Sequence, residues 1–124
     1  MYELTVETSF AAAHCLEGHP SSCGRLHGHN WTVAVTVAGE QLNSAGMLVD
    51  FAVLKQAVRE AVGELDHRYL NELPFFSGGM APTAENIARH VFETVAAKLS
   101  AQTNFQVKEV RVAEAPTSWV VYRP

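Results

Sequence analysis

The sequence predicts one α+β domain over residues 1–124, in which a four-stranded, mainly antiparallel sheet carries two helices on one face. Three observations indicate this class. Two long segments near the start alternate apolar and polar residues, which is the period of a half-buried strand. Two later segments place apolar residues at helical spacing, and two further strand-like segments end the sequence. The order β-β-α-α-β-β packs most simply as a sheet with both helices on one side.

Composition places the chain among globular proteins, because 48% of its 124 residues are hydrophobic and 18% are charged. No apolar run approaches the roughly 18–20 residues of a membrane span. The first residues lack the basic and apolar regions of a signal peptide, so we expect a cytoplasmic protein. A net charge of −4 argues against a nucleic-acid binder, which would need a basic surface. Cys15 and Cys23 are expected to stay reduced in the cytosol.

The first two strands bring three histidines into view. In the strand predicted over residues 2–14, the even-numbered residues form the apolar face, and His14 ends that face. A loop rich in Gly, Ser and Pro follows, and the second strand runs from about residue 27 to 39. His27 and His29 share the parity of its apolar residues, which are Trp31, Val33, Val35 and Val37. If the strands pair as an antiparallel hairpin, His14 comes close to His27 and His29.

The two helices are predicted from caps and apolar spacing. Asp50 is the expected N-cap of the first helix, which ends near Asp66 and His67. Residues 68–82 contain several Pro and Gly residues and are expected to be irregular. Thr83 is the expected N-cap of the second helix. The core stripe of that helix consists of Ile87, Val91, Val95 and Leu99.

The last two strands are predicted over residues 105–114 and 118–123. The parity of apolar residues switches near Glu109, which indicates a β-bulge. An open sheet of this kind leaves edge strands that invite pairing with other chains. We therefore expect oligomerisation by edge pairing, which could close the sheets into a barrel.

The three histidines predict a metal site. His14, His27 and His29 offer three imidazoles with an open fourth position, which is typical of catalytic zinc, although iron or another divalent metal could use the same nitrogen atoms. Cys23 could fill the fourth position and give a closed structural site. It could instead act as a base or nucleophile near the metal, or simply be a small buried thiol. Cys15 follows His14 directly and is expected to serve packing.

Several acidic residues have both a chemical and a structural interpretation. Asp66 and His67 could form a proton relay, or they could simply end a helix where such residues are favourable. Glu85 lies in the first turn of the second helix, where any acid is favourable. Glu114 ends a valine-rich strand, and its carboxylate could be solvated or could accept a pair of N–H donors from a heterocycle.

Motifs along almost the whole chain match one known family. They are Phe10-Ala11-Ala12-Ala13-His14, Cys23 with His27-Gly28-His29, Gly46-Met47-Leu48-Val49-Asp50-Phe51, Leu65-Asp66-His67 with Leu70-Asn71, Pro82-Thr83-Ala84-Glu85-Asn86, and Glu114. In this order they make the chain resemble the 6-pyruvoyl-tetrahydropterin synthase family. Within it, the chain is most similar to the bacterial 6-carboxy-tetrahydropterin synthases of queuosine biosynthesis.

The resemblance implies the tunnelling fold, in which β-β-α-α-β-β subunits join sheet edges into a barrel, as a homo-oligomer that is a hexamer in the family. It implies Zn²⁺ on three ligands, His14, His27 and His29. It implies an acid–base set of Cys23, Asp66 and His67, the last two supplied by a neighbouring subunit. It also implies a pterin pocket made by Thr83, Glu85 and Glu114.

The choice of reaction rests on loop spacing. Three residues separate Cys23 from His27, as in the enzymes that form 6-carboxy-tetrahydropterin, whereas the pyruvoyl-forming enzymes have a longer loop. The expected substrate is 7,8-dihydroneopterin triphosphate, with acetaldehyde and triphosphate released. The alternatives are triphosphate elimination without carbon loss, and a non-catalytic domain with structural zinc. Arg25, Lys55 and Arg68 are candidates for triphosphate binding, and none is assigned.

Overall fold

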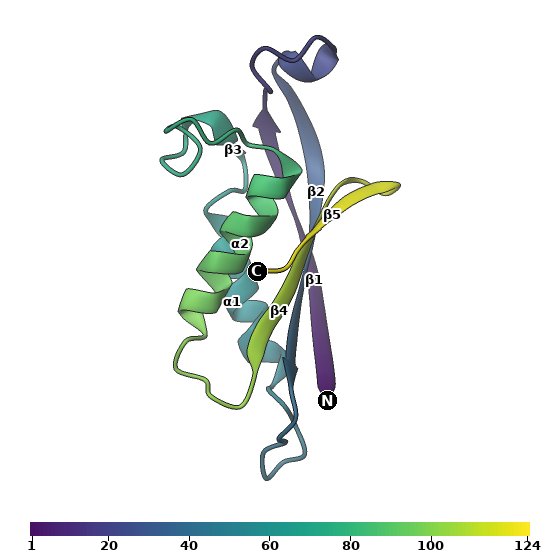
Figure 1. Cartoon of the computed structure of the whole chain (residues 1–124), viewed down its shortest axis with the longest axis vertical. Helices are drawn as coiled ribbons and strands as arrows, with labels where there is room; N and C mark the ends of the chain where they lie inside the picture. Colours follow the sequence, from purple (N-terminus) through teal and green to yellow (C-terminus); the bar gives the residue numbers. More distant parts are fainter.

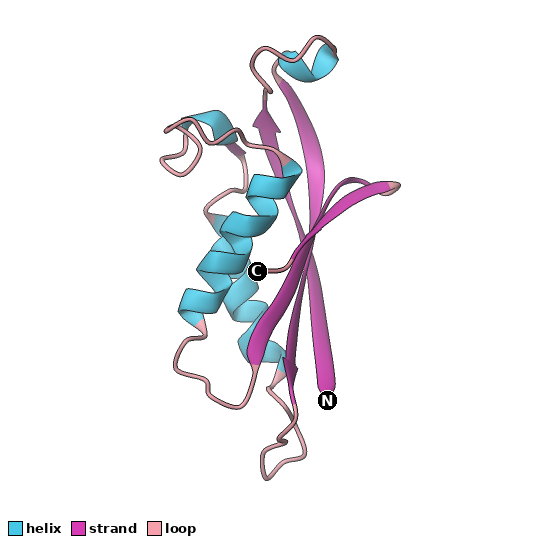
Figure 2. Ribbon diagram, in the orientation of Figure 1, coloured by secondary structure: helices cyan, strands magenta, loops and turns pink.

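The computed structural model describes residues 1–124, and its helices lie on one side of a single sheet. The helices α1 (Phe51–Gly63) and α2 (Ala84–Lys98) pack side by side on this face, and no helix covers the other face (Figures 1 and 2). The predicted α+β class and the positions of both helices are confirmed. Neither helix has the length and apolar character needed to cross a membrane.

The longest contact in the sheet is the hairpin of β1 (Tyr2–His14) and β2 (His27–Gly39). The two strands are antiparallel, and their register runs without a slip from the Tyr2–Gly39 pair to the His14–His27 pair. Val33, Val35 and Val37 of β2 are fully buried beneath the helices, as the alternation predicts. The hairpin therefore sets the position of every side chain on this face relative to its neighbours.

The sheet continues through β4 (Gln106–Ala115) to β5 (Ser118–Tyr122), both in antiparallel pairs. The register of β4 against β2 shifts between Val107 and Glu109, so that Lys108 is an extra residue. This shift confirms the predicted bulge. A bulge bends its strand and increases the local twist, and Figure 1 shows β4 and β5 curving away from the long hairpin.

The sheet has five strands, so the predicted count of four is wrong. The additional strand is β3 (Arg68–Tyr69), which pairs in parallel with β1 at Ala12 and Ala13 and gives the order β3-β1-β2-β4-β5. It lies in a segment expected to be irregular. Two residues have no readable periodicity. The strand forms because the edge of β1 offers unpaired backbone groups, and the His67 N–H donates to the Ala11 carbonyl at 2.6 Å beside it.

The predicted caps hold both helices in place. The Asp50 carboxylate accepts a hydrogen bond from the Ala52 N–H at 2.8 Å, and the Thr83 hydroxyl accepts one from the Asn86 N–H at 3.2 Å. Each cap satisfies a backbone donor that has no partner inside the helix. The cap at Thr83 fixes where α2 begins, which is beside the histidine end of the hairpin.

His90 on α2 is packed under the segment that precedes this helix, and its ring lies 4.3 Å from that of Phe75. Burial lowers the pKa of His90 below 6.5, against the weaker opposing effect of Glu64 and Glu93. Below pH 6.5 the unfolded chain then binds more protons than the folded one, so the His90 contribution to stability falls as the pH falls.

We expect His90 to titrate with a midpoint below 6.5 in a histidine-resolved NMR titration of the folded protein. We also expect the stability difference between the wild type and His90→Gln, measured by urea unfolding, to shift against the wild type between pH 7.5 and pH 5. A midpoint at or above 6.5 would contradict this account of His90 packing.

Candidate metal centre and active site

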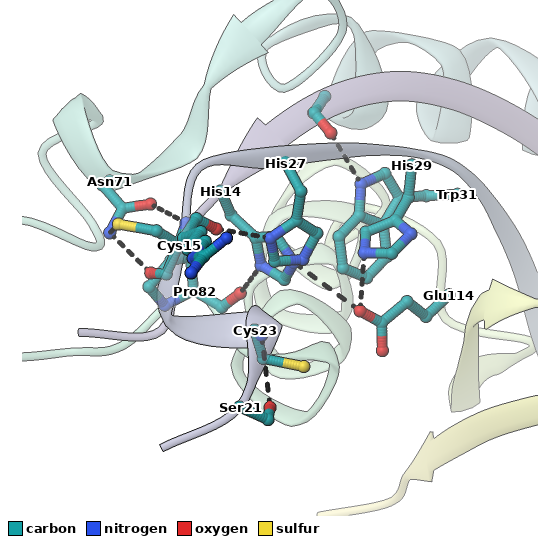
Figure 3. Close-up of polar contacts among 12 residues, drawn as sticks. His14, Cys15, Ser21, Cys23, His27, His29, Trp31, Asn71, Pro82 and Glu114 are labelled. Carbon is teal, nitrogen blue, oxygen red and sulfur yellow. Dashed lines mark hydrogen bonds and ion pairs between the residues drawn. The ribbon is translucent and has the colours of Figure 1, made fainter. Parts of the chain in front are cut away.

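The hairpin register brings three imidazoles together at one end of the sheet. His14 is directly opposite His27, and His29 follows on the same face of β2. The ring centroids lie 4.5 Å apart for His14–His27, 4.8 Å for His27–His29 and 5.3 Å for His14–His29 (Figure 3). The expectation that a hairpin would gather these side chains is confirmed.

Two backbone carbonyls orient the imidazoles. Nδ1 of His14 lies 2.7 Å from the Pro82 carbonyl oxygen, and Nδ1 of His27 lies 2.6 Å from that of Arg25 (Figure 3). A carbonyl oxygen can only accept, so Nδ1 carries the proton and donates in both rings. The lone pair of Nε2 is therefore free in each ring. This is the arrangement by which proteins prepare histidines to bind a metal.

Trp31 forms the floor under the group. It is completely buried, and its ring meets those of His14 and His29 edge to face, with centroids 5.0 and 5.1 Å apart. Its Nε1–H donates to the Ala12 carbonyl at 3.2 Å, so the indole is anchored to the neighbouring strand. The rigid apolar floor leaves the imidazoles little freedom to move away from one another.

Glu114 completes the group from β4. The register of β4 against β5 shifts between Ala113 and Ala115, which makes Glu114 the extra residue of a second bulge. Its Oε1 lies 2.7 Å from His29 Nε2 and 3.6 Å from His14 Nε2. The family resemblance implies that this carboxylate binds a pterin, and the sequence did not predict its contact with the histidines. Only one residue of β4 follows Glu114, so the strand is too short beyond this bulge for a switch in parity to be read from the sequence.

These residues fit a divalent metal. One potential ligand atom from each of the three histidines and Glu114 lies within 4.8 Å of every other. In a tetrahedral zinc site with Zn–N distances of about 2.0–2.1 Å, ligand atoms lie roughly 3.3–3.4 Å apart, so only a small closure is needed. Nε2 of His14 is buried without a hydrogen-bond partner, which is costly unless something binds there. Nε2 of His29 is buried too and lies against Glu114 Oε1.

The electrostatics also favour ligation. His14 is 1% exposed, and burial lowers its pKa below 6.5, with the carbonyl of Pro82 opposing that effect. His27 and His29 lower the pKa further by charge repulsion, and Glu114 opposes it. His14 is therefore neutral near pH 7, and the neutral imidazole is the form that binds a metal.

Asp66 and His67 form a pair at the outer edge of β1. One carboxylate oxygen of Asp66 accepts from the Ala11 N–H at 2.9 Å, and the other lies 3.0 Å from His67 Nδ1. These two bonds, that from Ala11 first, lower the pKa of Asp66 below 3.8. His67 has a φ of 58°, a left-handed conformation that costs roughly 1–3 kcal/mol and is frequent at functional sites.

This pair lies outside the group of potential metal ligands within one chain. The His67 side chain is 82% exposed, and its only polar partner is Asp66. The hollow beside it has a volume of about 560 Å³ and is lined by nine residues, which include His67, Arg68 and His29. An oriented imidazole facing an open hollow is suited to proton transfer with a molecule that enters from outside.

The remaining predicted residues lie around the same end of the sheet. Cys23 is in a 3₁₀ turn of the loop between β1 and β2, and it lies outside the group of potential ligands (Figure 3). Both Cys23 and Cys15 are free thiols. Thr83 and Glu85 begin α2, directly after the residue whose carbonyl holds His14. Glu85 is exposed, and the Thr83 hydroxyl is used as the cap.

The sequence did not predict the groups that hold the imidazoles in place. The carbonyls of Arg25 and Pro82 could not be found there, because every residue has such a group and only the fold decides which one faces a ring. Trp31 was assigned to the core, which is correct, but its role as floor needed the hairpin register.

Comparison with known proteins connects this site to one family. The family model described as 6-pyruvoyl tetrahydropterin synthase matches residues 3–124. A Bacillus subtilis protein named 6-carboxy-5,6,7,8-tetrahydropterin synthase is 39% identical over 128 residues, which cover 99% of this chain and 86% of that protein. A Synechocystis protein of the same name is 39% identical over 127 residues, covering 98% and 93%.

A solved structure shares the fold over its full length. The 6-pyruvoyl tetrahydropterin synthase of Caenorhabditis elegans superposes with a TM-score of 0.81 at 30% identity, covering all of this chain and 97% of the other. The sequence match and the structural match extend over the same residues, including those that carry the histidines. On this evidence the chain belongs to the 6-pyruvoyl tetrahydropterin synthase family.

Proposed function

We propose that this protein is a zinc-dependent 6-carboxy-5,6,7,8-tetrahydropterin synthase. The observation that carries the proposal is the histidine group, in which the buried Nε2 of His14 lacks a partner while backbone carbonyls hold the Nδ1 protons of His14 and His27. The relatives at 39% identity that have this name support the choice of reaction. The spacing between Cys23 and His27 supports it as well.

The proposed reaction converts 7,8-dihydroneopterin triphosphate to 6-carboxy-tetrahydropterin, acetaldehyde and triphosphate. Atom balance requires the uptake of a water molecule. The ring gains the hydrogens that the side chain loses, so the reaction needs no external reductant. Bound zinc, held by His14, His27 and His29, supplies a Lewis acid that makes the side-chain hydroxyls of the substrate more acidic.

The protein then has to move protons on the substrate side chain. We assign this work to Cys23 as base and to the pair of Asp66 and His67 as relay, in which the carboxylate orients the imidazole. The pair lies at the edge of β1 and outside the group of potential metal ligands, so we propose that it serves the site of a neighbouring subunit. The open edges of β1 and β5 offer the surfaces for such an assembly.

We assign the pterin ring to Glu114, with Thr83 and Glu85 lining the pocket. A carboxylate can accept two N–H donors from the guanidine-like edge of a pterin, which is a strong charge-assisted pattern. Glu114 lies beside the histidines, so a pterin held there would have its side chain next to the metal ligands. Glu114 is then a substrate-binding residue, and zinc does not need it as a ligand.

One other reaction has specific support. The C. elegans structure and the family model are both named for 6-pyruvoyl tetrahydropterin synthase, which would eliminate triphosphate and keep all side-chain carbons. The two reactions share the substrate and the proposed early proton transfers. They differ in the cleavage of a carbon–carbon bond, so their products separate them.

The zinc content of purified variants distinguishes the metal ligands from the other residues of the site. We expect His27→Ala to lose stoichiometric zinc, measured by metal analysis after purification, because only two imidazoles remain. We expect Cys23→Ala to keep zinc while turnover falls by about 10²–10⁴-fold, a typical effect of removing an acid–base group. We expect Glu114→Ala to keep zinc as well and to bind the substrate more weakly. Loss of both zinc and folded structure in Cys23→Ala would favour a closed structural site instead.

The product identifies the reaction. We expect the purified zinc enzyme to release acetaldehyde and triphosphate in equal amounts from 7,8-dihydroneopterin triphosphate, measured by a coupled dehydrogenase assay and by phosphate chromatography. Protein stripped of metal is the control and should release neither. Triphosphate without acetaldehyde would assign the protein to the pyruvoyl-forming reaction.

Mixed oligomers test the contribution of a neighbouring subunit. Cys23→Ala and His67→Ala should each be inactive alone. Random co-assembly in equal amounts should restore about a quarter of wild-type activity, because the intact residues come from different chains in that fraction of sites. The control is a mixture of the two variants that is never dissociated. If co-assembled oligomers stay inactive, the relay acts within its own chain.

A further inference from the structure

The first histidine of the group stands where its strand ends. β1 stops at His14, which makes the last pair of the hairpin with His27. Cys15 follows at once, and its N–H and carbonyl lie on the same side of β1 as those of Ala11, toward β3, whose two residues end at Tyr69 opposite Ala13. The N–H and carbonyl of a half-buried residue need partners. What holds Cys15 therefore also fixes the backbone that carries His14.

Asn71 supplies both of the missing partners. Its Oδ1 accepts from the Cys15 N–H at 3.0 Å, and its Nδ2 donates to the Cys15 carbonyl at 2.9 Å. Figure 3 shows the carboxamide of Asn71 facing the backbone of Cys15 beside the histidine rings. The side chain takes the place of a peptide group in an adjacent strand and extends the ladder past the end of β1. Both bonds are partly buried, so water replaces them poorly.

The segment that carries Asn71 is itself attached to β1. Tyr69 pairs with Ala13 in the parallel ladder of β3, and its hydroxyl lies 3.2 Å from the Cys15 Sγ. Asn71 Nδ2 also lies 3.5 Å from this sulfur. The pairing of β3 with β1 therefore fixes the position of Asn71 along β1. From there its carboxamide reaches the residue that follows the first histidine.

We propose that Asn71 is a positioning residue for the metal centre, which acts by holding the Cys15 peptide and so the backbone of His14. The inference rests on the proposed function only in that the histidine group binds a metal. Asparagine is required because one side chain has to accept and donate at once. Aspartate can accept from the N–H but cannot donate to the carbonyl, and alanine can do neither.

The Pro82 carbonyl fixes the rotation of the His14 ring, whereas Asn71 fixes the position of the backbone that carries this ring. The two constraints come from opposite ends of the segment that joins η2 (Leu70–Glu72) to α2. With Asn71 removed, the ring keeps its hydrogen-bond partner, but the backbone around His14 is held only through its pairing with His27 of β2. A ligand atom displaced by even a fraction of an ångström weakens a metal site, and supporting residues of this kind typically contribute 10–100-fold to affinity.

The test is metal affinity of the full-length protein, stripped of metal and titrated with Zn²⁺ against a chelating indicator. We expect Asn71→Ala to bind Zn²⁺ about 10–100-fold more weakly than the wild type. Asn71→Asp keeps one of the two hydrogen bonds, so its affinity for Zn²⁺ should lie between those of the wild type and Asn71→Ala. With Co²⁺ as probe, the visible ligand-field bands of Asn71→Asp should shift, which a loss of stability alone would not produce.

The matched control is Asn104→Ala. Asn104 also holds a loop through its carboxamide, by donating to the Leu48 carbonyl at 2.7 Å, but it lies beside Gly39 at the far end of β2. This variant should lose stability and keep the wild-type affinity for Zn²⁺. Unchanged affinity in Asn71→Ala would overturn the inference, and so would an equal loss in both variants. If Asn71→Ala fails to fold, Asn71→Asp carries the same test.

The affinity measurement separates this inference from the proposed function. Weak Zn²⁺ binding by Asn71→Ala together with a wild type that binds Zn²⁺ but forms no acetaldehyde would support the positioning role and contradict the reaction. If the wild type releases acetaldehyde and Asn71→Ala keeps the wild-type affinity for Zn²⁺, the proposed reaction is supported and the positioning role is contradicted.

Discussion

The pairing of His14 with His27 is the contact on which the site depends. An antiparallel register can slip only by moving every side chain to a new neighbour, and a slip of one residue would turn a whole apolar face toward water. The buried valines of β2 make such a slip very costly. The position of the histidines is therefore protected by the stability of the hydrophobic core, although the histidines themselves lie at its end.

Most residues of the site lie at the ends of strands and helices. Strand β1 ends at His14, α2 begins beside it, and the β4–β5 hairpin places Glu114 through a bulge. Backbone carbonyls that are unpaired at such ends become acceptors for imidazole Nδ1–H groups. A regular ladder would use these carbonyls internally, so the same site could not be built in the middle of the sheet.

The residues suited to metal binding and those suited to proton transfer lie in different parts of the subunit. The histidine group faces the helices over a floor formed by Trp31, whereas Asp66 and His67 lie at the open edge of β1. A single subunit holds the parts of a site without bringing them all together. In the proposed assembly, a second chain would bring its Asp66 and His67 to the first chain at the edges that remain unpaired here. Assembly and catalysis would then depend on the same strands.

Much of this could be predicted from the residues alone. Alternation in the first two strands determined which faces they bury, and with it that His14, His27 and His29 share one side, since the period of a strand is local. Caps and helical spacing located both helices for the same reason. The roles of Cys23, Asp66 and His67 came from family resemblance and stay predictions. Tertiary structure alone decided the fifth strand, the contact of Glu114 with His29, and the partners that orient the rings. These depend on backbone groups that every residue has, so only their place in the fold distinguishes them.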